Sequence, residues 1–168
     1  MTTLTMSRTA LRGLIKLNVF AGFLFLVLFV ASVIWGGPVM RALGVRPAAD
    51  SAGLILGMRA IMCLGILSVP VAHVVFSRLL AIVETVNAGD PFIVENAVRL
   101  QTIAWAVVGL EILHVAVAII ARASAGTQKL DIAWSFSVTR LLAILLLFVL
   151  ARVFAEGARM RDELAATV

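Results

Sequence analysis

Two ionisable side chains, Glu111 and Arg140, lie near the middle of long apolar stretches of this sequence. Glu111 interrupts the apolar run of residues 100–121, and Arg140 interrupts the run of residues 132–151. If both runs are helices that cross a membrane in opposite directions, each charge lies ~17 Å from the same membrane face, at 1.5 Å per residue. An ionisable group at this depth is costly and normally faces a partner inside the protein. We therefore expect an intramembrane ion pair between Glu111 and Arg140.

One helical turn after Glu111 comes His114, on the same predicted face. Imidazole titrates near neutral pH, so Glu111, His114 and Arg140 could form a proton-responsive cluster. The plainer interpretation, which we favour, is an ion pair that fixes the helix register beside an interior histidine with satisfied hydrogen bonds. Haem ligation by His73 and His114 is not expected, because they would lie ~6 Å and ~21 Å from one membrane face.

Few other residues offer chemistry. The sequence has one cysteine, two histidines and no recognisable Ser–His–Asp or paired-carboxylate motif from which a catalytic site could be built. We therefore predict that the protein is not an enzyme, with no catalytic residues, no metal site and no cofactor.

The composition points to lipid as the surrounding solvent. Of the 168 residues 62% are hydrophobic and 14% charged, with a mean hydropathy of +1.12, whereas soluble domains carry about 25% charged residues. The net charge is +5, but Lys and Arg are spread singly between apolar runs. That pattern suits loops at an anionic membrane surface and does not indicate direct nucleic-acid binding.

Four apolar stretches are long enough to cross the hydrocarbon layer as helices. Their continuous rather than alternating hydrophobicity excludes barrel strands, and they cover about residues 17–38, 54–77, 100–121 and 132–151. The first exceeds the length of a signal-peptide core, so we expect it to remain as an anchor. The predicted fold is all-α: one integral membrane domain over residues 1–168, built as a bundle of four transmembrane helices.

Basic residues in the loops predict the orientation, because cytoplasmic loops are richer in Lys and Arg. One side would hold eight of them: Arg8, Arg12, Lys16, Arg78, Arg99, Arg152, Arg159 and Arg161. The other side would hold four: Arg41, Arg46, Arg122 and Lys129. We therefore expect a multi-pass protein with both termini in the cytoplasm.

The connection between spans two and three is predicted to be a cytosolic helical hairpin. Apolar residues continue at helical spacing past residue 77, until Gly89, Asp90 and Pro91 break the pattern. Gly89 suits the left-handed position after a helix, while Asp90 and Pro91 suit the N-cap and first position of the next one. Asn96 and Arg99 then share one face, which we expect to be exposed to a partner or to lipid phosphates.

The hairpin and the tail carry a recognisable set of residues. The set comprises Gly89, Asp90, Pro91, Phe92, Asn96, Arg99 and Leu100, followed by Leu150 to Phe154, Gly157, Arg161, Leu164, Thr167 and Val168. It resembles the signature of the bacterial domain-of-unknown-function family 2975, although Ala104 occurs where we would expect Gly. This resemblance implies a small four-span protein of the bacterial cytoplasmic (inner) membrane, without an established activity. By gene neighbourhood alone, it also implies a small helix-turn-helix regulator as a cytosolic partner.

Two functions follow as hypotheses. The first is a regulatory or scaffolding membrane protein without its own catalytic site, whose hairpin (residues 78–99) and tail (residues 152–168) form one cytosolic surface for a protein partner. The alternative is a small proton-coupled transporter or exporter that acts as a homo-oligomer. An exporter of this kind needs an uncompensated carboxylate, and Arg140 would already neutralise Glu111. We therefore favour the first hypothesis.

Overall fold

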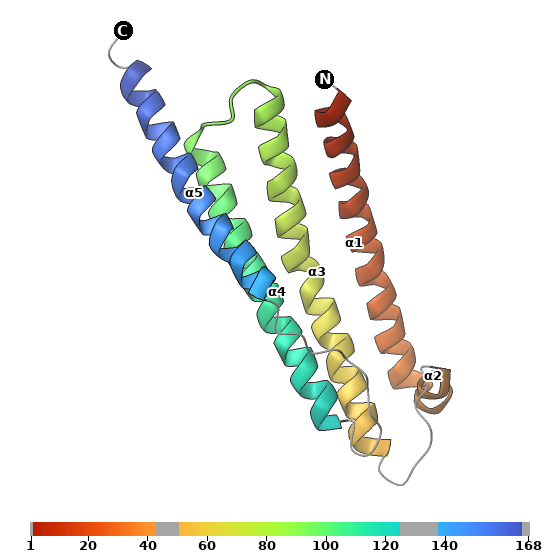
Figure 1. Cartoon of the computed structure of the whole chain (residues 1–168). Coiled ribbons are helices and arrows are strands. Elements are labelled where there is room, and N and C mark those ends of the chain that lie inside the picture. Colours follow the sequence, from red (N-terminus) through yellow and green to blue (C-terminus); the bar gives the residue numbers. More distant parts are fainter. Residues whose placement is uncertain (1, 43–50, 125–137, 166–168) are drawn as a thin grey trace. The chain divides into compact units, whose positions relative to one another are not determined.

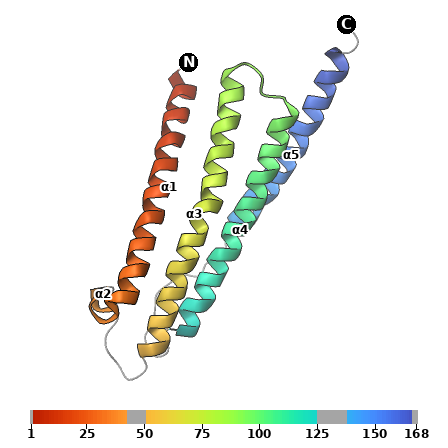
Figure 2. The same ribbon diagram turned by 180° about the vertical axis from the view of Figure 1, so that it is seen from behind.

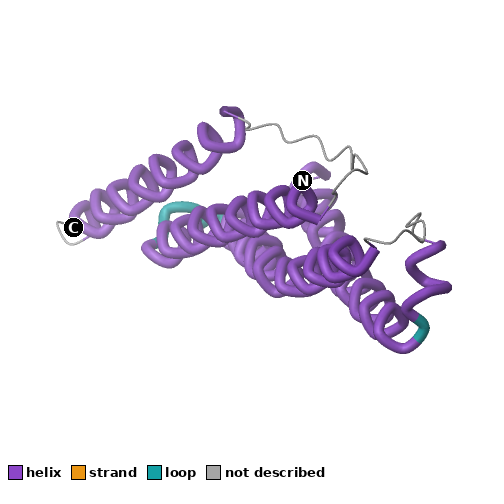
Figure 3. Tube along the Cα trace, turned by 90° about the horizontal axis from the view of Figure 1, so that it is seen from below, coloured by secondary structure: helices purple, strands orange, loops and turns teal. Residues whose placement is uncertain are grey.

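The computed structural model describes residues 2–42, 51–124 and 138–165, which are helical apart from short turns (Figure 3). Five helices follow one another in these ranges (Figure 1): α1 (Thr2–Ile34), α2 (Gly36–Ala42), α3 (Ser51–Asn87), α4 (Val94–Ser124) and α5 (Val138–Ala165). No strand occurs in the described ranges. The predicted all-α class is confirmed.

Four of the helices, α1, α3, α4 and α5, are long and apolar enough to cross a membrane, with mean hydropathies of 2.1 to 2.6. Only 6% of the most apolar window is buried in α1 and in α5, and 17% in α3 and in α4. Large side chains such as Phe20, Phe23, Leu145 and Leu146 are exposed. Soluble proteins rarely expose apolar surface on this scale, whereas lipid covers it without cost. The chain is therefore a small four-span membrane protein, as predicted.

The ends of the predicted spans differ from the helices at two places. The first span was expected to continue to residue 38, but α1 ends at Ile34 and the short α2 starts at Gly36. Pro38 has no backbone N–H to donate, so it is better accommodated in the first turn of a new helix than inside a long one. At the fourth span, residues 132–137 lie outside the described residues, and α5 continues well past residue 151.

The chain forms two compact units, each built from several segments. Unit 1 comprises Met1–Asn18, Val71–Gly109 and Phe136–Val168, and unit 2 comprises Val19–Pro70 and Leu110–Ser135. The helices α1, α3 and α4 each contribute to both units, so the division does not follow helix boundaries. The prediction of a single domain over residues 1–168 stays a prediction.

Small side chains occupy the helix contacts inside each unit. In unit 1 the buried apolar residues include Ala104, Ala151 and Ala158, and in unit 2 they include Ala118 and Ala121. Lipid is as apolar as a leucine side chain, so helices in a membrane gain most from close backbone approach. Three of these buried alanines, Ala104, Ala118 and Ala121, lie on α4.

Candidate functional site

The hairpin begins with a helix stop at the end of α3 (Figure 2). Gly89 has a φ of 88°, which glycine adopts without steric cost. Its N–H bonds the carbonyl of Val86 at 3.1 Å, and the N–H of Asp90 bonds the carbonyl of Thr85 at 3.0 Å. These two bonds are the pair that defines a Schellman motif. The predicted role of Gly89 as the residue after the helix is confirmed.

The predicted roles of Asp90 and Pro91 at the start of the next helix are wrong. The helix α4 begins at Val94, so neither residue is its N-cap or its first residue. Instead, the Asp90 carboxylate pairs with the Arg161 guanidinium on α5, from Nη1 to Oδ1 and from Nη2 to Oδ2, the latter at 3.2 Å. A two-point contact between guanidinium and carboxylate is charge-assisted and fixes the relative geometry of the two groups.

The same arginine reaches the backbone of the turn. Arg161 Nη1 also donates to the carbonyl oxygen of Phe92 at 3.3 Å. Both Arg161 and Asp90 keep about half of their side-chain surface exposed, 50% and 49%. Water therefore screens the ion pair, and its strength lies in fixing geometry more than in stabilising the fold.

Phe92 makes the apolar half of this contact. Its ring lies 5.2 Å from the ring of Phe154, centre to centre, at an interplanar angle of 39°. A Cβ added at Gly157 would lie 3.0 Å from the Phe92 ring, tighter than most contacts of a Cβ atom, so the ring would have to shift by a few tenths of an ångström. Glycine at position 157 therefore lets the aromatic side chain of the turn lie against the backbone of α5. Even so, 45% of Phe92 stays exposed.

Asn96 is fully buried, at 0% exposure, so the expectation that it is a surface residue is wrong. Its Nδ2 donates to Thr85 Oγ1 at 2.7 Å and to the carbonyl of Pro91 at 2.9 Å. Its Oδ1 accepts a hydrogen bond from Arg99 Nη1 at 2.8 Å. One side chain thus ties the last turn of α3, the turn itself and the first turns of α4 together.

Arg99 shares in this network. Besides the bond to Asn96, its Nη1 lies 3.4 Å from the carbonyl oxygen of Ala81 on α3. The side chain is half-buried between the two arms of the hairpin. Among the hairpin residues singled out from the sequence, Asn96 and Arg99 therefore shape the hairpin, whereas Asp90 and Phe92 join it to the tail.

The N-terminal part of α1 also contacts the hairpin within unit 1. The Arg8 and Arg12 guanidinium groups lie 3.3 Å and 3.5 Å from the carboxylate of Glu84 on α3. The start of α1 and the end of α3 are therefore neighbours. This ion pair was not foreseen, because nothing in the local sequence couples residues so far apart in the chain.

Glu111 and His114 lie on α4 in unit 2 and Arg140 lies on α5 in unit 1, each of them half-buried. The ion pair of Glu111 with Arg140 stays a prediction. His114 borders an apolar cavity of about 300 Å³, to which α1 contributes Phe25 and α3 contributes Ser68. No three His, Cys, Asp or Glu side chains of the described segments gather as metal ligands would.

An arginine of unit 2 shows how a charge is accommodated in an apolar helix pair. Arg59 lies on α3, and its Nη2 donates at 2.6 Å to the carbonyl oxygen of Ser32 on α1, a residue with no exposed surface. The hydroxyl of Ser32 bonds the Phe29 carbonyl at 2.9 Å. Arg59 thus joins α1 to α3.

Comparison with known proteins identifies the family of this chain. The family described as "Protein of unknown function (DUF2975)" matches residues 16–168. The chain belongs to the DUF2975 family. Comparisons with curated proteins and with solved structures gave no match.

For this DUF2975 protein, the signature residues predicted where a structured site lies. They did not predict what each residue does in that site. The hairpin and tail motifs do meet, through Asp90, Phe92, Gly157 and Arg161. What the sequence concealed is the burial of Asn96, because amides are usually exposed.

Proposed function

We propose that this DUF2975 protein is a regulatory or scaffolding protein of the bacterial cytoplasmic membrane, without catalysis of its own. Its partner-binding region is a hairpin–tail surface, formed by side chains of the turn and of the last turns of α5 that keep about half or more of their surface exposed. The surface comprises Asp90, Phe92, Glu156, Arg159, Arg161, Asp162 and Glu163. In this proposal both termini and the surface face the cytoplasm, where a soluble protein binds them.

The observation that carries the proposal is the contact of Asp90 and Phe92 with Arg161 of α5. It joins segments that lie 71 residues apart in the chain into one continuous surface. The two-point ion pair and the aromatic contact hold the turn and α5 in a fixed arrangement, which two separate helix ends in water would not have. A surface that is already ordered binds a partner without the entropic cost of folding first.

The chemistry of the surface suits a polar protein partner. Arg159 contacts Glu156 at 2.8 Å and Glu163 at 3.5 Å, so charges of both signs alternate along the exposed side of α5. Mixed charges of this kind confer specificity through complementary pairing. Phe92 adds a half-exposed aromatic ring of the type that often anchors protein interfaces. A small helix-turn-helix regulator is the partner that the family's gene neighbourhood suggests.

The test is a cross-linking pull-down from native membranes with the charge reversals Asp162→Lys and Glu163→Lys. Both side chains are exposed, so the melting temperature should not change. If the surface binds a soluble protein, each reversal should lower recovery of that protein by about tenfold, the loss of one strong interfacial charge pair. Glu95→Lys is the matched control, since Glu95 is exposed on α4 outside the surface.

Unchanged recovery in both reversals would show that the surface does not bind the partner. Equal loss in the Glu95→Lys control would assign the effect to general charge, and the proposal would fail as well.

The alternative function is proton-coupled transport by a homo-oligomer. The feature in its favour is His114 at the edge of the apolar cavity of unit 2, where a titratable group meets a space large enough for a small ligand. We rank it second, because the cavity has few polar groups with which to recognise a substrate.

A further inference from the structure

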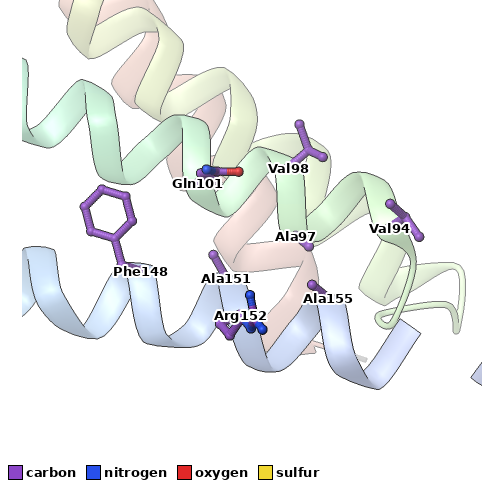
Figure 4. A pocket seen from close by; sticks show the side chains of 8 residues that line it. All are labelled: Val94, Ala97, Val98, Gln101, Phe148, Ala151, Arg152 and Ala155. Carbon is purple, nitrogen blue, oxygen red and sulfur yellow. The ribbon is translucent and has the colours of Figure 1, made fainter. Parts of the chain in front are cut away.

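A groove runs between α4 and α5 in unit 1, with a volume of about 280 Å³ (Figure 4). Ala97 and Ala151 contribute only small side chains to the lining of this groove. Gln101 and Arg152 provide the polar groups of the lining, and Phe148 lies at one end (Figure 4). The groove is therefore apolar inside and carries a cation at its rim.

The groove lies where the apolar part of each helix ends. The third span was predicted to begin at residue 100 and the fourth to end at residue 151, next to Gln101 and Arg152. Trp105, on the apolar side of this level, is 62% exposed and packs edge-on against Phe148 at 5.4 Å. Exposed tryptophans gather at the headgroup level of a bilayer. The groove thus extends from the headgroup region into the hydrocarbon.

Basic side chains surround this part of α4. Arg152 lines the groove together with Val94 and Val98. The same two valines also line a second hollow of about 260 Å³, together with Arg78, Arg99 and Glu95. The two hollows therefore contain three guanidinium groups and one carboxylate, and this excess of positive charge favours an anion at the headgroup level.

We propose that the α4–α5 groove is a binding site for an anionic phospholipid of the surrounding membrane. Arg152 binds the phosphate, for which the planar guanidinium offers two parallel hydrogen bonds. One acyl chain lies along Ala97 and Ala151 toward Phe148. Alanines at these positions leave the width that a hydrocarbon chain needs. The site is separate from the hairpin–tail surface and does not depend on the proposed protein partner.

The experiment measures which lipids stay bound to the purified full-length chain, by native mass spectrometry from mixed micelles. Phosphatidylglycerol and phosphatidylcholine with identical acyl chains are supplied in equal amounts. The wild type should retain phosphatidylglycerol preferentially. Arg152→Gln should lower that preference by about fivefold, the contribution of one arginine near an anionic surface. Arg41→Gln, the same charge change at an exposed residue of α2, should leave it unchanged.

A second variant tests the groove itself. Ala155→Leu adds bulk to an exposed residue of the lining without changing charge, and it should reduce retention of both lipids. Melting temperatures confirm that each variant is folded.

Wild-type retention in both Arg152→Gln and Ala155→Leu would overturn the proposal, as would equal retention of the two lipids by the wild type. If Ala155→Leu instead converted a dimer to a monomer and left lipid retention unchanged, the groove would be a contact between copies and not a lipid site.

Discussion

The hairpin of unit 1 and the α1–α3 contact of unit 2 both place a polar side chain between helices, but they satisfy it differently. In the hairpin, the Asn96 amide has three hydrogen-bond partners within 3.0 Å. In unit 2, Arg59 donates through Nη2 to one backbone carbonyl, while its buried Nε has no partner in the described part of the chain.

The difference shows where the sequence specifies geometry most closely. A closed network such as that of Asn96 fixes the positions of several segments at once, because any shift leaves a buried group without a partner. A single bond to a carbonyl, as made by Arg59, holds two helices together but tolerates small displacements. The hairpin is thus the precisely positioned part of the molecule, and α1–α3 packing is the more permissive part.

The largest effect is expected from Asn96→Ala. The change removes three hydrogen bonds and leaves buried polar groups unpaired, so it should cost about 2–3 kcal/mol of stability. For a chain of this size the melting temperature should fall by roughly 4–12 °C, as measured in detergent by circular dichroism. Glu95→Ala, at the exposed neighbouring residue, should have no effect. A stable Asn96→Ala variant would mean that the hairpin is no more closely specified than unit 2.

A smaller effect is expected at the predicted ion pair of Glu111 and Arg140. If the two groups are paired, Glu111→Gln and Arg140→Gln should each lower the melting temperature, and the double variant should recover part of the loss. The coupling energy in a membrane should be about 1–2 kcal/mol. Additive losses would exclude the pair. Loss of proton flux in liposomes with unchanged stability in Glu111→Gln would favour the transporter function.

The smallest change in stability is expected at the junction of hairpin and tail. Asp90→Asn should cost only about 0.2–1 kcal/mol, because the ion pair with Arg161 is half-exposed and screened by salt. Limited proteolysis should nevertheless cut the tail faster in this variant, and Arg161→Gln should add nothing further. Asp162→Asn is the matched control. Equal cleavage rates in Asp90→Asn and wild type would show that the tail does not depend on this contact.

The sequence predicted the four spans and the hairpin because both depend on local signals. Long apolar runs can only be spanning helices in lipid, and Gly89 marked the helix end through its backbone preference alone. The roles of Asp90 and Asn96 depend on Arg161 and Thr85, which local patterns do not connect to them. Capping preference favoured Asp90 as an N-cap, and only the distant arginine explains its different role.

The long separation between Asp90 and Arg161 also affects how the protein is made. The ribosome adds roughly 5–20 residues per second, and the two residues are 71 apart. Asp90 therefore emerges roughly 4–14 s before the arginine that binds it. During this interval the nascent chain displays the turn without its tail, and the exposed ring of Phe92 is available to chaperones and proteases. The hairpin–tail surface can therefore form only after residue 161 has been synthesised.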